Sequence, residues 1–88
     1  MIRKEVTIQN AEGLQSHPAA MLVQTACRYT SRILIEQGPK TINAKSMMGV
    51  LSLGVGRDGK ILLCIDGEDE ISAMEAITKL IDAGFKAQ

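Results

Sequence analysis

The sequence predicts an α+β fold in which helices cover one face of a mostly antiparallel sheet. In residues 2–8 the apolar side chains fall at even positions among polar ones, which is the period of a half-buried strand. In residues 18–29 and 69–83 apolar side chains instead recur every three or four positions, as in an amphipathic helix. The order of all expected elements is β-α-β-β-α-β-α, which favours one sheet layer and one helix layer.

The first strand, in residues 2–8, is followed by a turn at residues 10–13. The first helix is expected from Pro18 to about Tyr29, because proline lacks an N–H that the first helical turn does not need. The side chains of this helix that recur at helical spacing are Ala19, Leu22, Val23 and Ala26.

The middle of the chain is expected to form a hairpin and a short helix. Residues 32–36 pair with residues 41–43 through a Gly-Pro turn. Ser46 then precedes an apolar segment that ends by Gly54. A serine directly before an apolar helical run is a typical N-cap.

The last third of the chain is expected to form a strand, residues 61–65, and a helix from about Asp69 to Ala83. Acidic residues lie at the positive end of the helix dipole, and Gly84 is placed to terminate the helix. One face of this helix is expected to consist of Ile71, Met74, Ile77, Thr78, Leu80 and Ile81.

Composition excludes several classes of function. The 88 residues have room for one core, so residues 1–88 are expected to be a single domain. Ten basic and ten acidic residues cancel, which argues against direct nucleic-acid binding. The sequence contains neither a long apolar run nor a signal peptide, so we expect a cytoplasmic protein without a membrane partner. Cys27 and Cys64 are expected to be reduced packing residues, and with one histidine neither a metal site nor another cofactor is expected.

Two segments carry a resemblance to a known family. The first is Gly13-Leu14-Gln15-Ser16-His17-Pro18-Ala19, and the second runs from Asn43 to Leu53 and includes Ser46. Both resemble HPr, the histidine phosphocarrier of the bacterial sugar phosphotransferase system, whose first segment reads Gly-aliphatic-His-Ala-Arg-Pro-Ala. Pattern alone also permits a ferredoxin-like fold. The resemblance covers essentially the whole chain and implies the open-faced β-sandwich of HPr, with four strands and three helices on one face.

Gln15 stands where the family has its phospho-accepting histidine, and His17 stands where it has an arginine. The lone pair of a carboxamide nitrogen is delocalised into the carbonyl, so Gln15 cannot accept a phosphoryl group from enzyme I, the family's donor. Residues two apart on a helix face different ways, so His17 is a poor substitute. Histidine is only partly charged near neutral pH and lacks the guanidinium fork, which weakens phosphate binding. No catalytic residue is therefore predicted.

In the resembling family, the serine that corresponds to Ser46 is modified by an ATP-dependent HPr kinase/phosphorylase, and the phosphoserine docks onto a LacI-type catabolite control repressor. The glutamine and the retained serine segment resemble Crh, the catabolite-repression branch of the family, although Crh keeps the arginine. The short helix after Ser46 is too apolar to be buried completely, which indicates an interface. The predicted partner-binding residues are Leu14, Gln15, His17, Ala20, Met47, Met48 and Leu51.

Three hypotheses of function follow. The first is a regulatory interaction protein switched by phosphorylation of Ser46. The second is a phosphocarrier that uses His17 as acceptor, with enzyme I as its partner. The third, a domain that binds a small molecule, has no specific support in the sequence. None of the three requires an enzyme active site.

Strand periodicity also makes a prediction about self-association. The side chains expected in the core are Val6, Ile8, Ile33, Ile35, Ile61, Leu63 and Ile65. This alternation places Leu34, Leu62 and Cys64 on the uncovered face of the sheet. The strand order that the resemblance implies sets the strand of Leu34 beside that of Leu62 and Cys64, so the three are expected to form a contiguous apolar patch. A small patch of this kind supports a weak, concentration-dependent homodimer.

Overall fold

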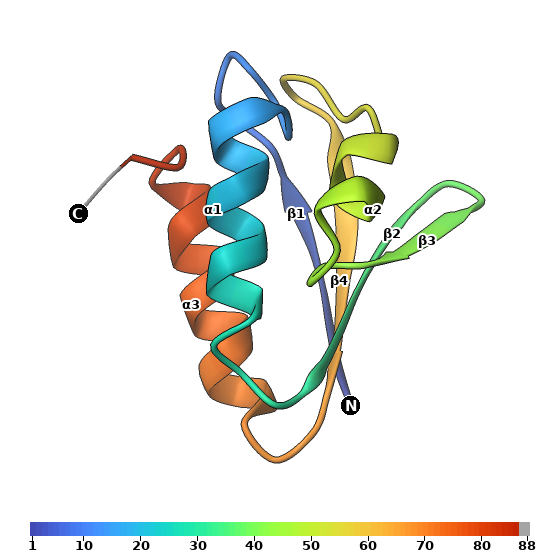
Figure 1. The fold of residues 1–88 in the computed structure, drawn as a ribbon, viewed down its shortest axis with the longest axis vertical. Helices are drawn as coiled ribbons and strands as arrows, with labels where there is room; N and C mark the ends of the chain where they lie inside the picture. The colour runs from blue at the N-terminus through green and yellow to red at the C-terminus, as the bar shows by residue number, and fades with distance from the viewer. Residues whose placement is uncertain (87–88) are drawn as a thin grey trace.

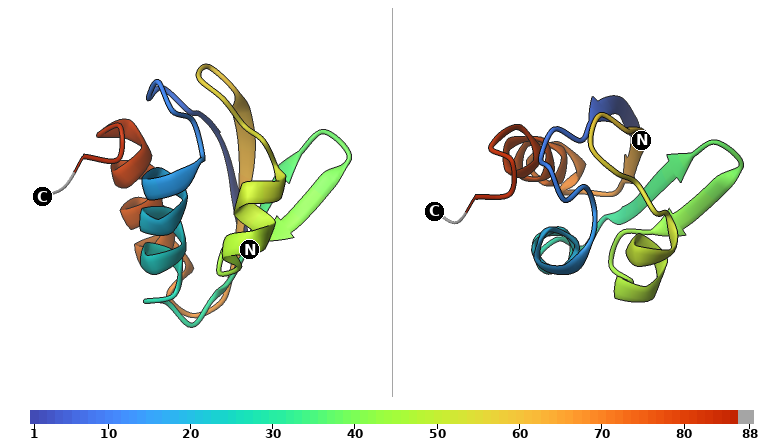
Figure 2. Two further views of the ribbon diagram at one scale, coloured as in Figure 1. Left: turned by 45° about the horizontal axis from the view of Figure 1, so that its top comes forward. Right: turned by 90° about the horizontal axis from the view of Figure 1, so that it is seen from above.

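The computed structural model describes residues 1–86; Ala87 and Gln88, which the predicted domain includes, lie outside the described residues. The four strands form one antiparallel sheet in the order β1-β4-β2-β3. The three helices cover one face of this sheet and leave the other face open (Figures 1 and 2), which confirms the predicted fold. In chain order the elements are β1 (Ile2–Thr7), α1 (Ser16–Ala26), β2 (Arg32–Gln37), β3 (Lys40–Asn43), α2 (Met47–Ser52), β4 (Lys60–Asp66) and α3 (Glu70–Asp82).

The core lies between the sheet and the helices. Cross-strand pairs such as Val6 with Ile61 and Ile33 with Ile65 place alternate apolar residues on the covered face. Every core residue predicted from strand periodicity is buried, with at most 7% of its surface exposed. Periodicity identified these residues because successive side chains of a strand point to opposite faces.

Helix α1 begins and ends earlier than its sequence pattern predicts. It starts at Ser16 rather than Pro18 and ends at Ala26 rather than near Tyr29. After Ala26 the chain tightens into a turn, in which the N–H of Tyr29 donates to the Ala26 carbonyl at 3.2 Å. The chain must turn here to reach β2, and that requirement is set by tertiary structure rather than by local pattern.

The predicted face of α3 is only partly buried, because Thr78 and Leu80 are intermediate in exposure and Ile71 is exposed. Met74, Ile77 and Ile81 are buried, whereas 65% of the Ile71 surface is exposed. Ile71 lies in the first turn of α3, beside Ile2, in an open groove between α3 and β1. Ala73 takes the buried place in this turn instead.

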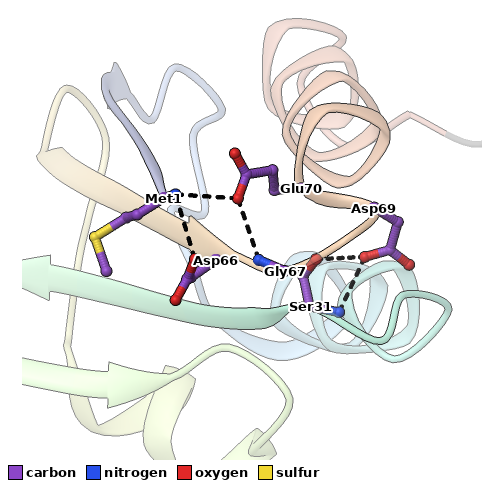
Figure 3. A network of polar contacts seen from close by, with 6 residues as sticks. All are labelled: Met1, Ser31, Asp66, Gly67, Asp69 and Glu70. Atoms are coloured by element: carbon purple, nitrogen blue, oxygen red, sulfur yellow. Dashed lines mark hydrogen bonds and ion pairs between the residues drawn. The ribbon is translucent and has the colours of Figure 1, made fainter.

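A polar network ties the start of α3 to the end of β4 and to β1 (Figure 3). The Met1 ammonium lies 3.3 Å from the Asp66 carboxylate and 3.2 Å from the Glu70 carboxylate. Glu70 also accepts the backbone N–H of Gly67 at 3.1 Å. These contacts hold β1, an edge strand, against the end of its neighbour β4.

The uncovered face of the sheet differs from its prediction at Cys64. Leu34 and Leu62 are partly exposed, but Cys64 is only 3% exposed, so the predicted exposed patch is limited to the two leucines. Cys64 pairs with Arg3 across the strands, and its thiol donates to the Glu36 carboxylate at 3.4 Å. Burial and the neighbouring Glu36 raise the pKa of this thiol. Cys27, expected to be a packing residue, is instead exposed.

Candidate functional site

The loop that carries Gln15 rests on the segment between α2 and β4. The Leu14 N–H donates to the Val55 carbonyl at 2.9 Å, and the Leu14 side chain is fully buried. Gly13 has a φ of +67°, and a Cβ at this position would overlap the Val55 carbonyl oxygen and lie 2.6 Å from the Gly56 Cα. Only glycine fits this close approach, so Gly13 sets the position from which the loop enters α1.

The start of α1 presents Gln15, Ser16 and His17 to solvent. Gln15 is the extended N-cap residue, and its side chain makes no capping hydrogen bond. Ser16 has a φ of +49°, a left-handed conformation that costs about 1 kcal/mol for a residue other than glycine. Ala20, a predicted contact residue one helical turn after Ser16, is partly exposed. Leu14, also predicted to contact a partner, is fully buried and instead packs under the loop.

The chemistry available at this end of α1 is limited. The first turn has no acidic residue and no side-chain cap, so its free N–H groups remain suited to an anion. Pro18 is buried in this turn and contributes no N–H. Gln15 offers an amide where phosphotransfer needs a nucleophilic ring nitrogen. The scaffold for a phosphate is therefore present without an acceptor at position 15.

Ser46 is the N-cap residue of α2, as its place in the sequence predicts. Its Oγ accepts the Gly49 N–H at 3.1 Å, and its carbonyl accepts the Val50 N–H at 3.0 Å. The residue is partly exposed. A Cβ at Gly49 would lie 3.4 Å from the Ser46 Oγ, so glycine at this position leaves space around the hydroxyl.

Helix α2 is buried on one side only. Val50 is fully buried, whereas 81% of Met48 and 41% of Leu51 are exposed. Met47 is partly buried against the core. Of the predicted interface residues of α2, Met48 and Leu51 therefore form its exposed apolar surface.

Helices α1 and α2 lie side by side and run in opposite directions (Figure 1). The Lys45 Nζ donates to the Tyr29 carbonyl at 2.7 Å, which fixes the residue before Ser46 to the turn that follows α1. The structure therefore brings both predicted segments to one α1–α2 surface, with Ser46 toward the C-terminal end of α1. The sequence did not predict that Lys45 and Val55 hold the two segments of this surface in place. The glycines on either side of Val55 are a sequence signal from which close packing of the backbone there could have been inferred.

Two structural findings concern other kinds of site. Within residues 1–86, the histidine, cysteine and acidic side chains form no group of three that could hold a metal ion. None of the helices in the described part of the chain is both long enough and apolar enough to cross a membrane.

The sequence and the fold are similar to those of known proteins. The family model described as "PTS HPr component phosphorylation site" matches residues 2–83. The HPr-like protein Crh of Halalkalibacterium halodurans is 46% identical over 82 residues, which cover 93% of this chain and 98% of that protein. The crystal structure of HPr-C-His from Thermoanaerobacter tengcongensis has a TM-score of 0.96 and 40% identity, covering 100% of this chain and 99% of that chain. Crh of Bacillus subtilis, a dimer with a swapped domain, has a TM-score of 0.76 and 37% identity, covering 99% and 100%.

Proposed function

Since the chain belongs to the PTS HPr family, we propose that it is a regulatory member, switched by phosphorylation of Ser46. It would act in carbon catabolite control through contacts with a LacI-type repressor. One observation carries this proposal: the α1–α2 surface keeps an accessible Ser46 beside exposed apolar side chains, while Gln15 replaces the acceptor of phosphotransfer. The similarity to Crh of Halalkalibacterium halodurans supports the same assignment.

Phosphorylation would change recognition more than folding. A phosphoserine carries about 1.5 to 2 negative charges near neutral pH and three strong acceptor oxygens. At Ser46 these charges lie at the N-terminal end of α2, where they are tolerated. They also lie close to Met48, which is 81% exposed. A partner with an arginine cluster beside an apolar pocket would therefore bind the phosphorylated protein in preference to the unmodified one.

The partners of this surface are an HPr kinase/phosphorylase and the repressor. His17, exposed at the other end of the surface, takes the place of an arginine that would hold phosphate more firmly. We therefore expect weaker repressor binding than for a relative with arginine at this position. His17 also supports the second candidate function, a phosphocarrier that receives its phosphoryl group from enzyme I.

The test combines phosphorylation with binding. Incubation with ATP and a purified HPr kinase should add one acid-stable phosphate to the protein, detected by mass spectrometry. Ser46→Ala should abolish the modification but also removes the cap on Gly49. Ser46→Asn is the matched control, because asparagine caps helices as well as serine does but cannot be phosphorylated by this kinase.

Binding to a catabolite control repressor should then require the phosphate and weaken on Met48→Ala or Leu51→Ala. Ile71→Ala, which removes an exposed apolar side chain from α3, should leave binding unchanged. Equal binding of the unmodified and phosphorylated proteins would contradict the switch, as would equal effects of the substitutions on α2 and α3.

A further inference from the structure

Strand β1 is an edge strand, and its partner strand in the described part of the chain is β4 alone (Figure 1). Directly after β1, the Ile8 N–H donates to the Gly59 carbonyl at 2.8 Å, so the main chain of Ile8 is directed toward β4. In an antiparallel pair every second residue is directed to the partner strand in this way. The main-chain groups of Arg3, Glu5 and Thr7 are therefore directed to the outer side of β1.

The groove between β1 and α3 lies next to these main-chain groups. It has a volume of about 590 Å³, and its lining includes Ile2 and Lys4 of β1 and Ile71 and Met74 of α3. Ile71 is 65% exposed, so part of the groove is an open apolar surface. An edge strand beside such a groove can hold an extended peptide, because the main chain of the strand gives affinity and the groove accepts alternate side chains.

The charges of β1 determine which strands can be added to it. Arg3, Lys4 and Glu5 are all exposed. They take part in none of the ion pairs found within residues 1–86, which are those of the Met1 ammonium. Charged side chains on an edge strand oppose pairing with an apolar strand, whereas opposite charges directly across two strands stabilise a pair. The edge therefore favours a strand that carries the complementary charges.

We propose that this edge binds an extended segment of another protein, which joins the sheet as an antiparallel strand beside β1. The segment exchanges main-chain hydrogen bonds with Arg3, Glu5 and Thr7. From its N-terminus onward, it carries a basic residue opposite Glu5, acidic residues opposite Lys4 and Arg3, and an apolar residue opposite Ile2. Because side chains alternate along a strand, the apolar residue and the acidic residue opposite Lys4 both enter the groove.

The groove is formed before a segment binds, and it is separate from the α1–α2 surface. The Met1 ammonium contacts Asp66 and Glu70, which holds the start of β1 beside the start of α3 (Figure 3). A site that is already in place loses less free energy in ordering when it binds. The described residues that line the groove belong to β1 and α3. Binding there is therefore independent of Ser46 and of the function proposed above.

The probe for this edge is the synthetic peptide Thr-Val-Lys-Glu-Glu-Val-Thr, acetylated and amidated at its ends. Its lysine is placed opposite Glu5, its first glutamate opposite Lys4 and its last valine opposite Ile2. Titration of the isotope-labelled protein, followed by two-dimensional NMR, should give a Kd on the order of 0.1–1 mM, because the contact is small. The shifted resonances should belong to β1 and α3, and the amide protons of Arg3, Glu5 and Thr7 should exchange more slowly.

Two methylated peptides distinguish strand addition from contact without main-chain pairing. In the proposed pairing the N–H of the peptide lysine donates to the Glu5 carbonyl, whereas the N–H of the first glutamate is directed to solvent. N-methylation of the lysine should therefore weaken binding by about fivefold or more. N-methylation of the first glutamate is the matched control and should change the Kd by less than about twofold.

Substitutions of charge in the protein test the predicted pairing. Lys4→Glu should weaken binding by about fivefold, because an attraction becomes a repulsion. A peptide with lysine in place of its first glutamate should restore the Kd of this variant to within about twofold. Lys40→Glu makes the same change on β3, the opposite edge strand, and should leave the Kd within about twofold.

Substitution of apolar residues tests the groove. Ile71→Ala should weaken binding by about threefold, because it removes apolar surface that the last valine of the peptide covers. Met48→Ala removes an exposed apolar side chain from α2 instead and should leave peptide binding unchanged. Circular dichroism and thermal unfolding establish that each variant is folded.

Three outcomes would overturn the proposal. One is the absence of resonance shifts up to about 5 mM peptide. Another is equal weakening by the two methylated peptides, which would mean contact without strand pairing. The third is a set of shifted resonances on α1 and α2 rather than on β1 and α3, which would place the peptide on the other surface.

Discussion

The Asp69 carboxylate at the start of α3 accepts both the backbone N–H of Ser31, at 3.0 Å, and the Ser31 hydroxyl. Its other oxygen accepts the Thr30 N–H at 2.9 Å. One carboxylate therefore satisfies two backbone donors of the chain that enters β2, which lies 38 residues earlier in the sequence. The contact joins α3 to the sheet at the end opposite to the Gln15 loop (Figures 1 and 3).

The first prediction concerns stability at acid pH. The Ser31 hydroxyl, and after it the Thr30 N–H, lower the pKa of Asp69 from 3.8 to about 2. A carboxylate with a depressed pKa in the folded state stabilises the fold above its unfolded pKa, and this contribution is lost as the pH falls from about 4 towards about 2. Urea unfolding, followed by circular dichroism from about pH 5 to about pH 2, should show this decline.

Asp69→Asn should have a lower free energy of unfolding at neutral pH. Its free energy of unfolding should also fall less steeply between about pH 4 and about pH 2, because the contribution of Asp69 is absent. Asp82→Asn changes an exposed carboxylate on the same helix and is the control. If Asp69→Asn retains the full slope of the unmodified protein between these pH values, another group is responsible for the acid sensitivity.

The second prediction compares two glycines with positive φ. Gly13 and Gly38 have φ values of +67° and +57°, but only Gly13 has backbone atoms where a Cβ would lie. Gly38→Ala should therefore cost about 1 kcal/mol, the strain of the left-handed conformation alone. Gly13→Ala should cost at least about 3 kcal/mol, because the loop must also move away from Val55. Denaturant unfolding measures both, and equal costs would mean that the loop yields freely at Gly13.

The third prediction concerns phosphotransfer. Incubation with enzyme I and labelled phosphoenolpyruvate should leave the protein without label, because Gln15 offers no nucleophile. A relative of the family with histidine at the corresponding position is the positive control. Gln15→His should restore labelling to the extent that enzyme I accepts His17 in place of arginine. Acid-labile label on the unmodified chain that disappears in His17→Ala would instead support the phosphocarrier function.

The sequence by itself determined the α+β class and much of the candidate site, and its resemblance to HPr selected the open-faced β-sandwich over a ferredoxin-like fold. Strand alternation identified the buried residues of the sheet, because the face to which a side chain points depends only on its place in the strand. The position of Ser46 before an apolar run predicted the cap that it makes to Gly49. The chemical limit at Gln15 follows from the identity of that residue and does not depend on the structure.

The tertiary structure decided which of these side chains are accessible. Cys64 lies on the uncovered face, as its register predicts, yet Arg3 and Glu36 from the neighbouring strands leave it only 3% exposed. Ile71 has the spacing of a buried residue but lies in the groove between α3 and the edge strand β1. Exposure depends on neighbours that come from distant parts of the chain, whereas local periodicity records only the direction of each side chain.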